Sequence, residues 1–426
     1  MDNMKGLLAL SPLMAFVAIY LVTSVVAHDF YKVPITIAFL ISCVYAIGRH
    51  RRETLEQRID VFTEGASTRN IMQMLWIFIL AGAFANTARS IGCIDATVDM
   101  ILSLLPQSLV LPGLFFATCF ISLSVGTSVG TIVALVPIAV GLAASMYASL
   151  PLVTAVVVGG AFFGDNLSFI SDTTIAATNS QNCRMSDKFK ANIYIALPAA
   201  IVVLAVYCMI GMNIPSHHVA HEADVPKVLP YLAVLVTAIM GVNVFSVLSI
   251  GTALALVIGL LDGGHDIFGL LHAMGDGVLS MSELIIITML AGGLFGLVRH
   301  DGGIDYIIGK ISRRVKGKRG AEFVICFLVA AVDMCTANNT VAIITVGGIA
   351  QNISKVYGVD NRRVASLLDT SSCFMQGLIP YGAQMLMASG LAKLNPLDII
   401  PYLYYPFVLA VFVAGSIILR FPRKYA

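Results

Sequence analysis

The chain has 426 residues, of which 58% are hydrophobic and 12% are charged, and its mean hydropathy is +0.89. A soluble core cannot absorb so much apolar surface, so most of the chain must face lipid. With a net charge of only +2, nothing in the sequence resembles a basic nucleic-acid-binding face, and no nucleic-acid partner is expected. The eight cysteines are scattered without a Cys-x-x-Cys pair, as expected for small core residues.

Long apolar runs predict five helices in each half of the chain. They fall at 7–26, 33–48, 71–91, 152–178 and 193–212, then at 229–245, 247–262, 284–299, 361–388 and 397–419. Between the third and fourth helix of each half lie two shorter arms, at 109–123 and 131–148, then at 320–335 and 341–356. Arms this short favour a re-entrant hairpin, and the alternative is that both arms cross; either choice leaves the flanking loops on the same sides.

The chain contains a copy of part of itself. Leu80, Ala81, Gly82, Arg89, Gly92, Ile94 and Asp95 recur 210 residues later as Leu290, Ala291, Gly292, Arg299, Gly302, Ile304 and Asp305. Five crossings is an odd number, so the two halves must run in opposite directions through the membrane. We therefore predict an all-α polytopic membrane protein with an inverted-topology repeat. Each half has about five crossings, one re-entrant hairpin and one broken helix, which is typical of secondary transporters.

The positive charges give the orientation of this arrangement. Of the 26 lysine and arginine residues, only Lys32, Arg89, Lys227 and Lys393 fall in segments expected on the outer side of the membrane, and the other 22 fall on the inner side. The positive-inside rule then places both termini in the cytoplasm of a multi-pass protein of the cell (inner) membrane. The expected organisation is a first repeat at 1–215, an external linker at 216–226 and a second repeat at 227–426.

A polar segment from Gly164 to Thr174 interrupts the first long apolar run. Its candidate ion-binding residues are Asp165, Asn166, Ser168, Ser171, Asp172 and Thr173. Such side chains compete for backbone groups and unwind a helix, which frees carbonyl oxygens for a hard cation. A carboxylate inside a membrane must be paired, protonated or bound to a cation. Asp165 and Asp172 are therefore the predicted Na+ ligands, and the alternative is a polar loop at a helix end.

The tips of the two hairpins carry the second set of candidates. The first tip, 124–131, is rich in Gly, Ser and Thr, and the second tip, 336–340, corresponds to it when Thr131 is aligned with Thr340 at an offset of 209. Permissive backbone and hydroxyl or amide ligands point to binding, although small residues also cluster where helices pack closely. The candidate residues are Thr127, Ser128, Thr131, Asn338, Asn339 and Thr340.

The second broken helix has a different composition from the first. At the same offset Ile379 aligns with Ile170, and Pro380 with two glycines breaks the helix at 373–384. This break contains Gln376 but no carboxylate, so the site should be asymmetric. Asp369 and Asp333 lie nearby, and the sequence leaves open whether they form a proton path into the cavity or line the cytoplasmic mouth.

The segment GDNLSFISDTT resembles the GDN-SPISDTT pattern of the NhaC-type sodium/proton antiporter family. The first tip and the stretch from Arg363 through Asp369 to Tyr381 are also similar, although Phe169 replaces the usual proline and two asparagines replace a Gly-Ser/Thr run. The resemblance spans the chain and implies an inverted-repeat cation exchanger with a transport domain moving against a scaffold. It places Thr127, Ser128 and the polar residues from Asp165 to Thr173 at the site.

Two functions follow from these residues. The leading one is exchange of Na+ for H+ by alternating access, with Asp165 holding either ion and Asp172 as second ligand or proton partner. The alternative is a Na+- or H+-coupled transporter or exchanger of a small organic anion or amino acid, bound through Asn338, Asn339 and Thr340. An enzyme is not expected, because no intramembrane histidine or His-Glu-x-x-His motif is present.

The expected partners are the lipid bilayer and the transported ions, Na+ and H+, with no cofactor. The sequence does not give the oligomeric state, although transporters with a moving domain commonly need a dimeric scaffold, which is compatible with a homodimer.

Overall fold

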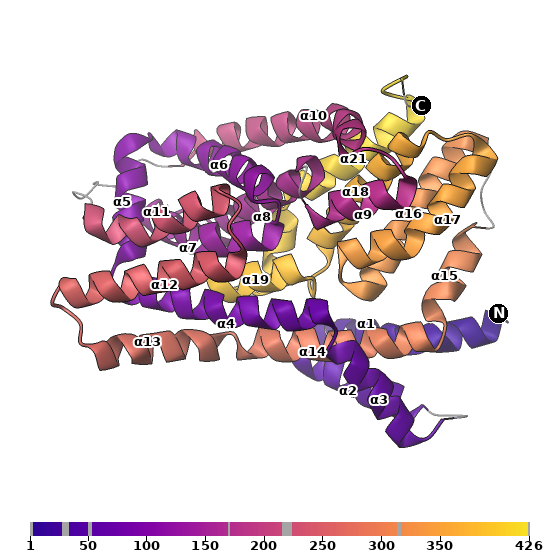
Figure 1. Cartoon of the computed structure of the whole chain (residues 1–426), viewed down its shortest axis with the longest axis horizontal. Coiled ribbons are helices and arrows are strands. Elements are labelled where there is room, and N and C mark those ends of the chain that lie inside the picture. Colours follow the sequence, from indigo (N-terminus) through magenta and orange to yellow (C-terminus); the bar gives the residue numbers. More distant parts are fainter. Residues whose placement is uncertain are drawn as a thin grey trace.

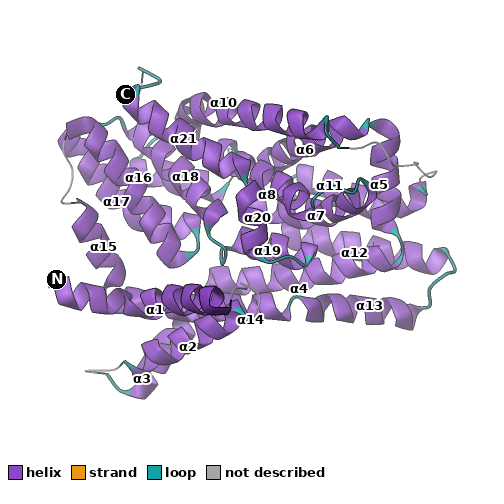
Figure 2. Cartoon of the chain, turned by 180° about the vertical axis from the view of Figure 1, so that it is seen from behind, coloured by secondary structure: helices purple, strands orange, loops and turns teal. Residues whose placement is uncertain are grey.

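The structure is a computed structural model, and it describes residues 3–27, 34–49, 53–168, 171–214, 224–312 and 317–424. Every regular element in these ranges is a helix, as predicted (Figures 1 and 2). Within them seven helices are long and apolar enough to cross a membrane, or eight if one bent pair counts as a single span. The chain is therefore a polytopic helical membrane protein.

The first half contains ten α-helices and one short 3-10 turn. They are α1 (Asn3–Ala27), α2 (Ile35–Gly48), α3 (Leu55–Ala66), α4 (Arg69–Ser90), α5 (Cys93–Leu104), η1 (Gln107–Leu109), α6 (Val110–Val125), α7 (Ser128–Ser145), α8 (Leu150–Leu167), α9 (Asp172–Gln181) and α10 (Met185–Gly211). Thus α6 and α7 are the arms of the first hairpin, and α8 and α9 are the two parts of the first broken helix.

The second half repeats this order. It runs through α11 (Val225–Ile239), α12 (Val244–Leu261), α13 (Ile267–Ser280), α14 (Ser282–His300), α15 (Gly303–Ser312), α16 (Gly317–Thr336), α17 (Asn339–Tyr357), α18 (Asn361–Leu378), α19 (Ala383–Ala392), α20 (Pro396–Ile399), η2 (Ile400–Tyr402) and α21 (Tyr404–Ile418). The second hairpin is α16–α17, and the second broken helix is α18–α19.

Residues with positive φ angles mark equivalent points in the two halves. Gly92 and Gly302 share a φ of 78°, at the offset of 210 that the sequence repeat predicts. The last residues of α9 and α19 are followed by Asn182 and Lys393, with φ of 50° and 54°. That second pair lies at an offset of 211, so the sequence alignment at 209 was wrong by two residues around the tips and breaks. Few residues are identical between the two halves in this region, so an alignment based on identities could not fix the offset correctly.

The helices form two layers (Figure 1). One layer holds α1–α4 and α12–α14, where α3 packs on α14 and α13 packs on α4. The other layer holds the hairpins and broken helices, where α6 and α7 pack on α8, and α16 and α17 pack on α18. The short helices exchange partners between halves, because α9 packs on α17 and α19 packs on α7. This exchange brings the two breaks and the two tips to the middle of the molecule.

Two amphipathic helices were missing from the prediction. The prediction was based on long apolar runs, so it did not detect α3 and α13. These helices lie in segments that were taken as linkers between the predicted helices. Thr54 and Gln57 form a capping box that starts α3, and the Asp266 side chain caps α13 by accepting from Gly269 N. The two helices are equivalent to each other in the repeat, and each packs along a long helix of the opposite half.

Both ends of the described chain lie toward the same end of the molecule, while the turn between α12 and α13 lies at the opposite end (Figure 1). This is the arrangement that the charge pattern predicts for the termini. The inverted orientation, the number of crossings and the domain boundaries stay predictions. Residues 216–223 of the expected linker lie outside the described residues, as do Lys32, Phe169 and Ile170.

Candidate functional site

The first break lies where the sequence predicts it. α8 ends at Leu167 and α9 begins at Asp172, and the flanking residues Ser168 and Ser171 have extended backbone. The Ser171 hydroxyl donates to the Asp165 carbonyl oxygen at 3.0 Å and accepts from Thr174 N, which caps α9. The Thr173 hydroxyl donates to the same carbonyl at 3.4 Å. These hydroxyls therefore hold the shape of the break.

The Asp165 carboxylate faces the first hairpin tip. Its side chain is 4% exposed, and Oδ1 accepts a hydrogen bond from Ser128 N at 3.1 Å. Ser128 is the first residue of α7, which Thr127 caps by accepting from Gly130 N. A helix N-terminus carries unpaired N–H groups and a partial positive charge, so it stabilises a nearby anion. The first tip thus holds one carboxylate oxygen of Asp165 through the backbone N–H of Ser128.

The second tip is built in the same way from amide side chains. Asn338 takes the place of Thr127 and caps α17 by accepting from Val341 N at 3.0 Å. The Asn339 Oδ1 atom accepts from Thr340 N at 3.0 Å. Asn339 is 7% exposed, and its Nδ2 group has no hydrogen-bond partner among the described residues. This tip therefore presents a side-chain amide donor where the first tip presents side-chain hydroxyl groups.

Gln376 links the second break to both tips. Its Nε2 group donates to the Ala337 carbonyl oxygen at 3.1 Å and to Gln384 Oε1 at 2.9 Å. The Nε2 group of Gln384 then donates to Ser128 Oγ at 3.0 Å, in the first tip. The remaining Oε1 atom of Gln376 is buried and has no hydrogen-bond partner among the described residues. It is therefore an acceptor that no described donor uses.

Both tips and both breaks line one cavity of about 1040 Å³. Its lining includes the candidate residues Thr127, Ser128, Asp165, Asp172, Thr173, Asn338, Asn339, Thr340 and Gln376. Asp172 is exposed within it, and Arg69 and Asn70 at the start of α4 also line it. The structure thus brings together residues from four separate segments of the chain around one polar space.

Four of the predicted residues lie behind this cavity. Asn166, Ser168, Ser171 and Thr131 are buried and do not line it. The Thr131 hydroxyl donates to the Thr127 carbonyl oxygen at 3.0 Å, inside the first turn of α7. The Asn166 side chain donates to the Phe162 carbonyl oxygen and to Tyr405 Oη. These side chains support the cavity wall.

Asp333 and Asp369 are fully buried in the helix bundle and line neither the cavity nor its mouth. Both carboxylate oxygens of Asp333 have no hydrogen-bond partner among the described residues. Asp369 Oδ2 lies 2.8 Å from Lys188 Nζ and 2.8 Å from Asn192 Nδ2. The sequence left open whether Asp333 and Asp369 face the cavity or its cytoplasmic mouth. In the structure both are buried among the helices instead.

Sequence reasoning missed Lys188, Asn192 and Gln384. Lys188 lies in a charged run that the positive-inside rule assigns to a cytoplasmic loop, yet it is 1% exposed. Its spacing of four from Asn192 places both on one face of α10, which is the signal that could have found the pair. Gln384 is the second residue of α19 and the last residue of the 373–384 break, from which only Gln376 was chosen.

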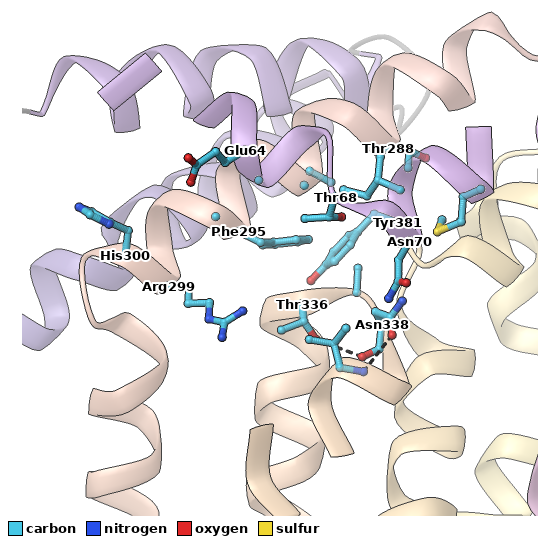
Figure 3. A pocket seen from close by; sticks show the side chains of 18 of the residues that line it. Glu64, Thr68, Asn70, Thr288, Phe295, Arg299, His300, Thr336, Asn338 and Tyr381 are labelled. Carbon is cyan, nitrogen blue, oxygen red and sulfur yellow. Dashed lines mark hydrogen bonds between the residues drawn. The ribbon is translucent and has the colours of Figure 1, made fainter. Parts of the chain in front are cut away.

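A second cavity of about 560 Å³ adjoins the first and shares Asn70, Met74, Ala337 and Asn338 with it. Figure 3 shows Arg299 extending from α14 toward the tip that carries Thr336 and Asn338. At its inner end the rings of Phe295 and Tyr381 lie 5.9 Å apart. Tyr381 Oη donates to the Met334 carbonyl oxygen at 2.8 Å, so this aromatic wall is tied to the second hairpin.

An all-helical membrane fold with two broken helices and two hairpin tips around a polar cavity defines a secondary transporter. A sequence model described as the Na+/H+ antiporter family matches residues 4–212 and 226–422. The chain belongs to the Na+/H+ antiporter family.

Several curated proteins are similar to the chain along most of its length. It is 20% identical to the malate-2H(+)/Na(+)-lactate antiporter of Bacillus subtilis, with 89% of this chain and 88% of that protein covered. It is 21% identical to the Na(+)/H(+) antiporter NhaC of the same organism, covering 84% and 85%. It is 22% identical to an uncharacterized Na(+)/H(+) antiporter of Haemophilus influenzae, covering 76% and 78%.

Proposed function

We propose that this protein exchanges Na+ for H+ across the cell membrane, and that Asp165 is the group for which the two ions compete. The observation that carries this assignment is the placement of Asp165. It is the one carboxylate in the described cavity lining that is both buried and held by a hairpin tip. Asp172 lines the same cavity but is exposed.

Competition at one carboxylate produces exchange. Burial disfavours the charged form of a carboxylic acid, while a bound cation favours it. The oxygens that support Na+ binding are the second carboxylate oxygen of Asp165 and the unpaired Oε1 of Gln376, with Asp172 completing the charge at the open side. Binding of Na+ then releases the proton, and binding of a proton releases Na+, so the two ions cannot cross together.

The setting in the cell follows from the family and the charge pattern. We propose a multi-pass protein of the cell (inner) membrane with both termini cytoplasmic and a homodimeric scaffold. It would use no cofactor and no enzymatic step, because the ions themselves are the substrates. The Arg69 and Arg299 ends of the two cavities then open toward the cytoplasm.

The test of this function uses the purified protein in liposomes that contain a pH-sensitive dye. An inward Na+ gradient without any organic solute should drive protons out of the vesicles. An equal gradient of choline chloride is the control for ionic strength and osmotic pressure. Proton movement that requires an added organic solute would reject Na+/H+ exchange as the complete reaction.

The donor groups of the second tip favour a second candidate, exchange of a small organic anion coupled to Na+ or H+. The Asn339 Nδ2 group is buried beside the cavity and has no hydrogen-bond partner in the described part of the chain, and an N–H donor binds a carboxylate and not a cation. A relative is named a malate-2H(+)/Na(+)-lactate antiporter, which supports an organic acid as the anion. Malate added to the same vesicles should then accelerate the Na+-driven proton flux, and no response to malate or lactate would reject it.

A further inference from the structure

The ammonium group of Lys188 lies in an unusual environment for a lysine. Its Nζ atom donates to the Asn166 carbonyl oxygen at 2.8 Å and to Thr174 Oγ1 at 2.6 Å, and it lies 2.8 Å from Asp369 Oδ2. All three donors of the ammonium are therefore used. The three acceptors come from the end of α8, the start of α9 and the middle of α18, so one side chain of α10 joins three other helices.

These acceptors are the kinds of oxygen that coordinate a hard metal cation. They are a carbonyl freed by the broken helix, a hydroxyl and a carboxylate, which is the same set of groups that the Asp165 side of the break offers. Asn192 holds two of these acceptors in place, because its Nδ2 donates to both Asn166 O and Asp369 Oδ2, at 2.8 Å each. The arrangement is buried and lies outside the described cavities.

Two further oxygens of the residues in this arrangement have no hydrogen-bond partner within the described ranges. Asp369 Oδ1 and Asn192 Oδ1 are buried and accept no hydrogen bond from the described residues. An ammonium group can satisfy three acceptors, whereas a metal cation of the same charge accepts a larger number of oxygen ligands. The residues therefore supply more ligands than the lysine uses.

We propose that Asn166 O, Thr174 Oγ1 and the Asp369 carboxylate form a second cation-coordinating position at the first break, and that the ammonium of Lys188 fills it in place of a sodium ion. The lysine charge is covalently fixed, so this position does not exchange. One mobile cation position then remains, on the Asp165 side of the same break. The proposal goes beyond the exchange function and does not depend on which ion Asp165 carries.

The experiment removes the ammonium and asks whether Na+ replaces it. The midpoint of thermal unfolding of the purified full chain is measured in NaCl and in choline chloride of equal concentration. An Asp165→Asn background removes the proposed exchange site, so any response to Na+ must come from elsewhere. Into this background we introduce Lys188→Ala, which opens space for an ion and leaves the oxygen ligands in place.

Lys188→Ala should create a saturable rise of about 3 °C in NaCl that the Asp165→Asn protein lacks. Adding Asp369→Asn should remove the rise, because the carboxylate ligand is lost. The matched control is Lys190→Ala, an exposed lysine two residues along α10, which should create no response. A folded Lys188→Ala protein whose midpoint is equal in NaCl and choline chloride would overturn the proposal.

The Lys188→Ser variant provides a second test, since it opens the same space and adds one hydroxyl ligand. If neither variant folds in saturating NaCl, the proposal is overturned as well, because it requires Na+ to replace the ammonium. A response to Na+ that is already present in the Asp165→Asn protein would instead count against Asp165 as the exchange site. The increase caused by Lys188→Ala would still be read against that baseline.

Discussion

Asp165 and Gln376 occupy equivalent positions in the two broken helices, and both line the same cavity. Each lies three residues before the C-cap of its helix, which is Ser168 for α8 and Ile379 for α18. One half therefore supplies a carboxylate where the other supplies an amide on a side chain that is one methylene longer. One proton or one monovalent cation is enough to neutralise the single buried charge at these two equivalent positions.

Replacing Gln376 by leucine should weaken Na+ binding without abolishing exchange. The substitution removes the unpaired Oε1 ligand and the two hydrogen bonds that join the second tip to Gln384. Loss of one neutral ligand corresponds to about 1.4 kcal/mol, so the apparent KM for Na+ should rise about tenfold. Na+-dependent proton flux in proteoliposomes measures it. Asn179→Ala, on the exposed side of the same cavity, is the control, and an unchanged KM for Gln376→Leu would exclude a ligand role.

Replacing Asn339 by alanine separates binding of an organic anion from exchange of ions. The side chain's one hydrogen bond in the described chain is from Thr340 N to Oδ1, so the fold should tolerate the change. If the Nδ2 group binds a carboxylate, the variant should lose most of any malate-stimulated flux and keep Na+/H+ exchange. Loss of folded protein, with anion stimulation unchanged per folded molecule, would instead assign the asparagine a structural role.

Asp369→Asn should destabilise the protein, because it leaves the Lys188 ammonium buried without its carboxylate. Breaking one side of a buried ion pair costs about 3 kcal/mol. The double variant Lys188→Met/Asp369→Asn removes both charges and should recover most of the loss, which a double-mutant cycle on thermal unfolding measures. The Lys190→Met change is the control for α10. Additive effects of the two substitutions would show that the pair at 2.8 Å is not coupled.

Much of this site could be predicted from the sequence, because it depends on local composition. The first break, the two tips and Gln376 were found from residues that interrupt apolar runs, and the repeat was found from shared identities. Lys188 could not be recognised, since its burial depends on α10 packing against α8, α9 and α18. The equivalence of Asp165 and Gln376 also required backbone landmarks such as Asn182 and Lys393, because the side chains at the two breaks differ.

The loop before α18 provides a prediction on pH. The Asp360 side chain caps α18 and pairs with Arg362, whose hydrogen bond lowers the pKa of Asp360 below its ordinary value of 3.8. A lowered pKa in the folded state stabilises the protein above pH 3.8, and this contribution is lost as the pH falls through the folded-state value. Asp360→Asn should therefore cost about 0.5 kcal/mol at pH 7, and nothing once Asp360 is protonated. Thermal unfolding of the wild-type and Asp360→Asn proteins at pH 7 and pH 3 checks this prediction. A stability difference between the two proteins that is the same at both pH values would contradict it.

The most direct test of the account is the Na+-driven proton flux of the Asp165→Asn protein. The substitution keeps size and hydrogen-bonding capacity but removes the charge and the proton-binding site. We predict a folded, membrane-inserted protein without exchange, whereas Asp172→Asn, in the exposed part of the same cavity, should still exchange ions with a higher KM for Na+. Equal loss in both variants would indicate a shared two-carboxylate site. Full Na+-driven proton flux by the Asp165→Asn protein would contradict the account.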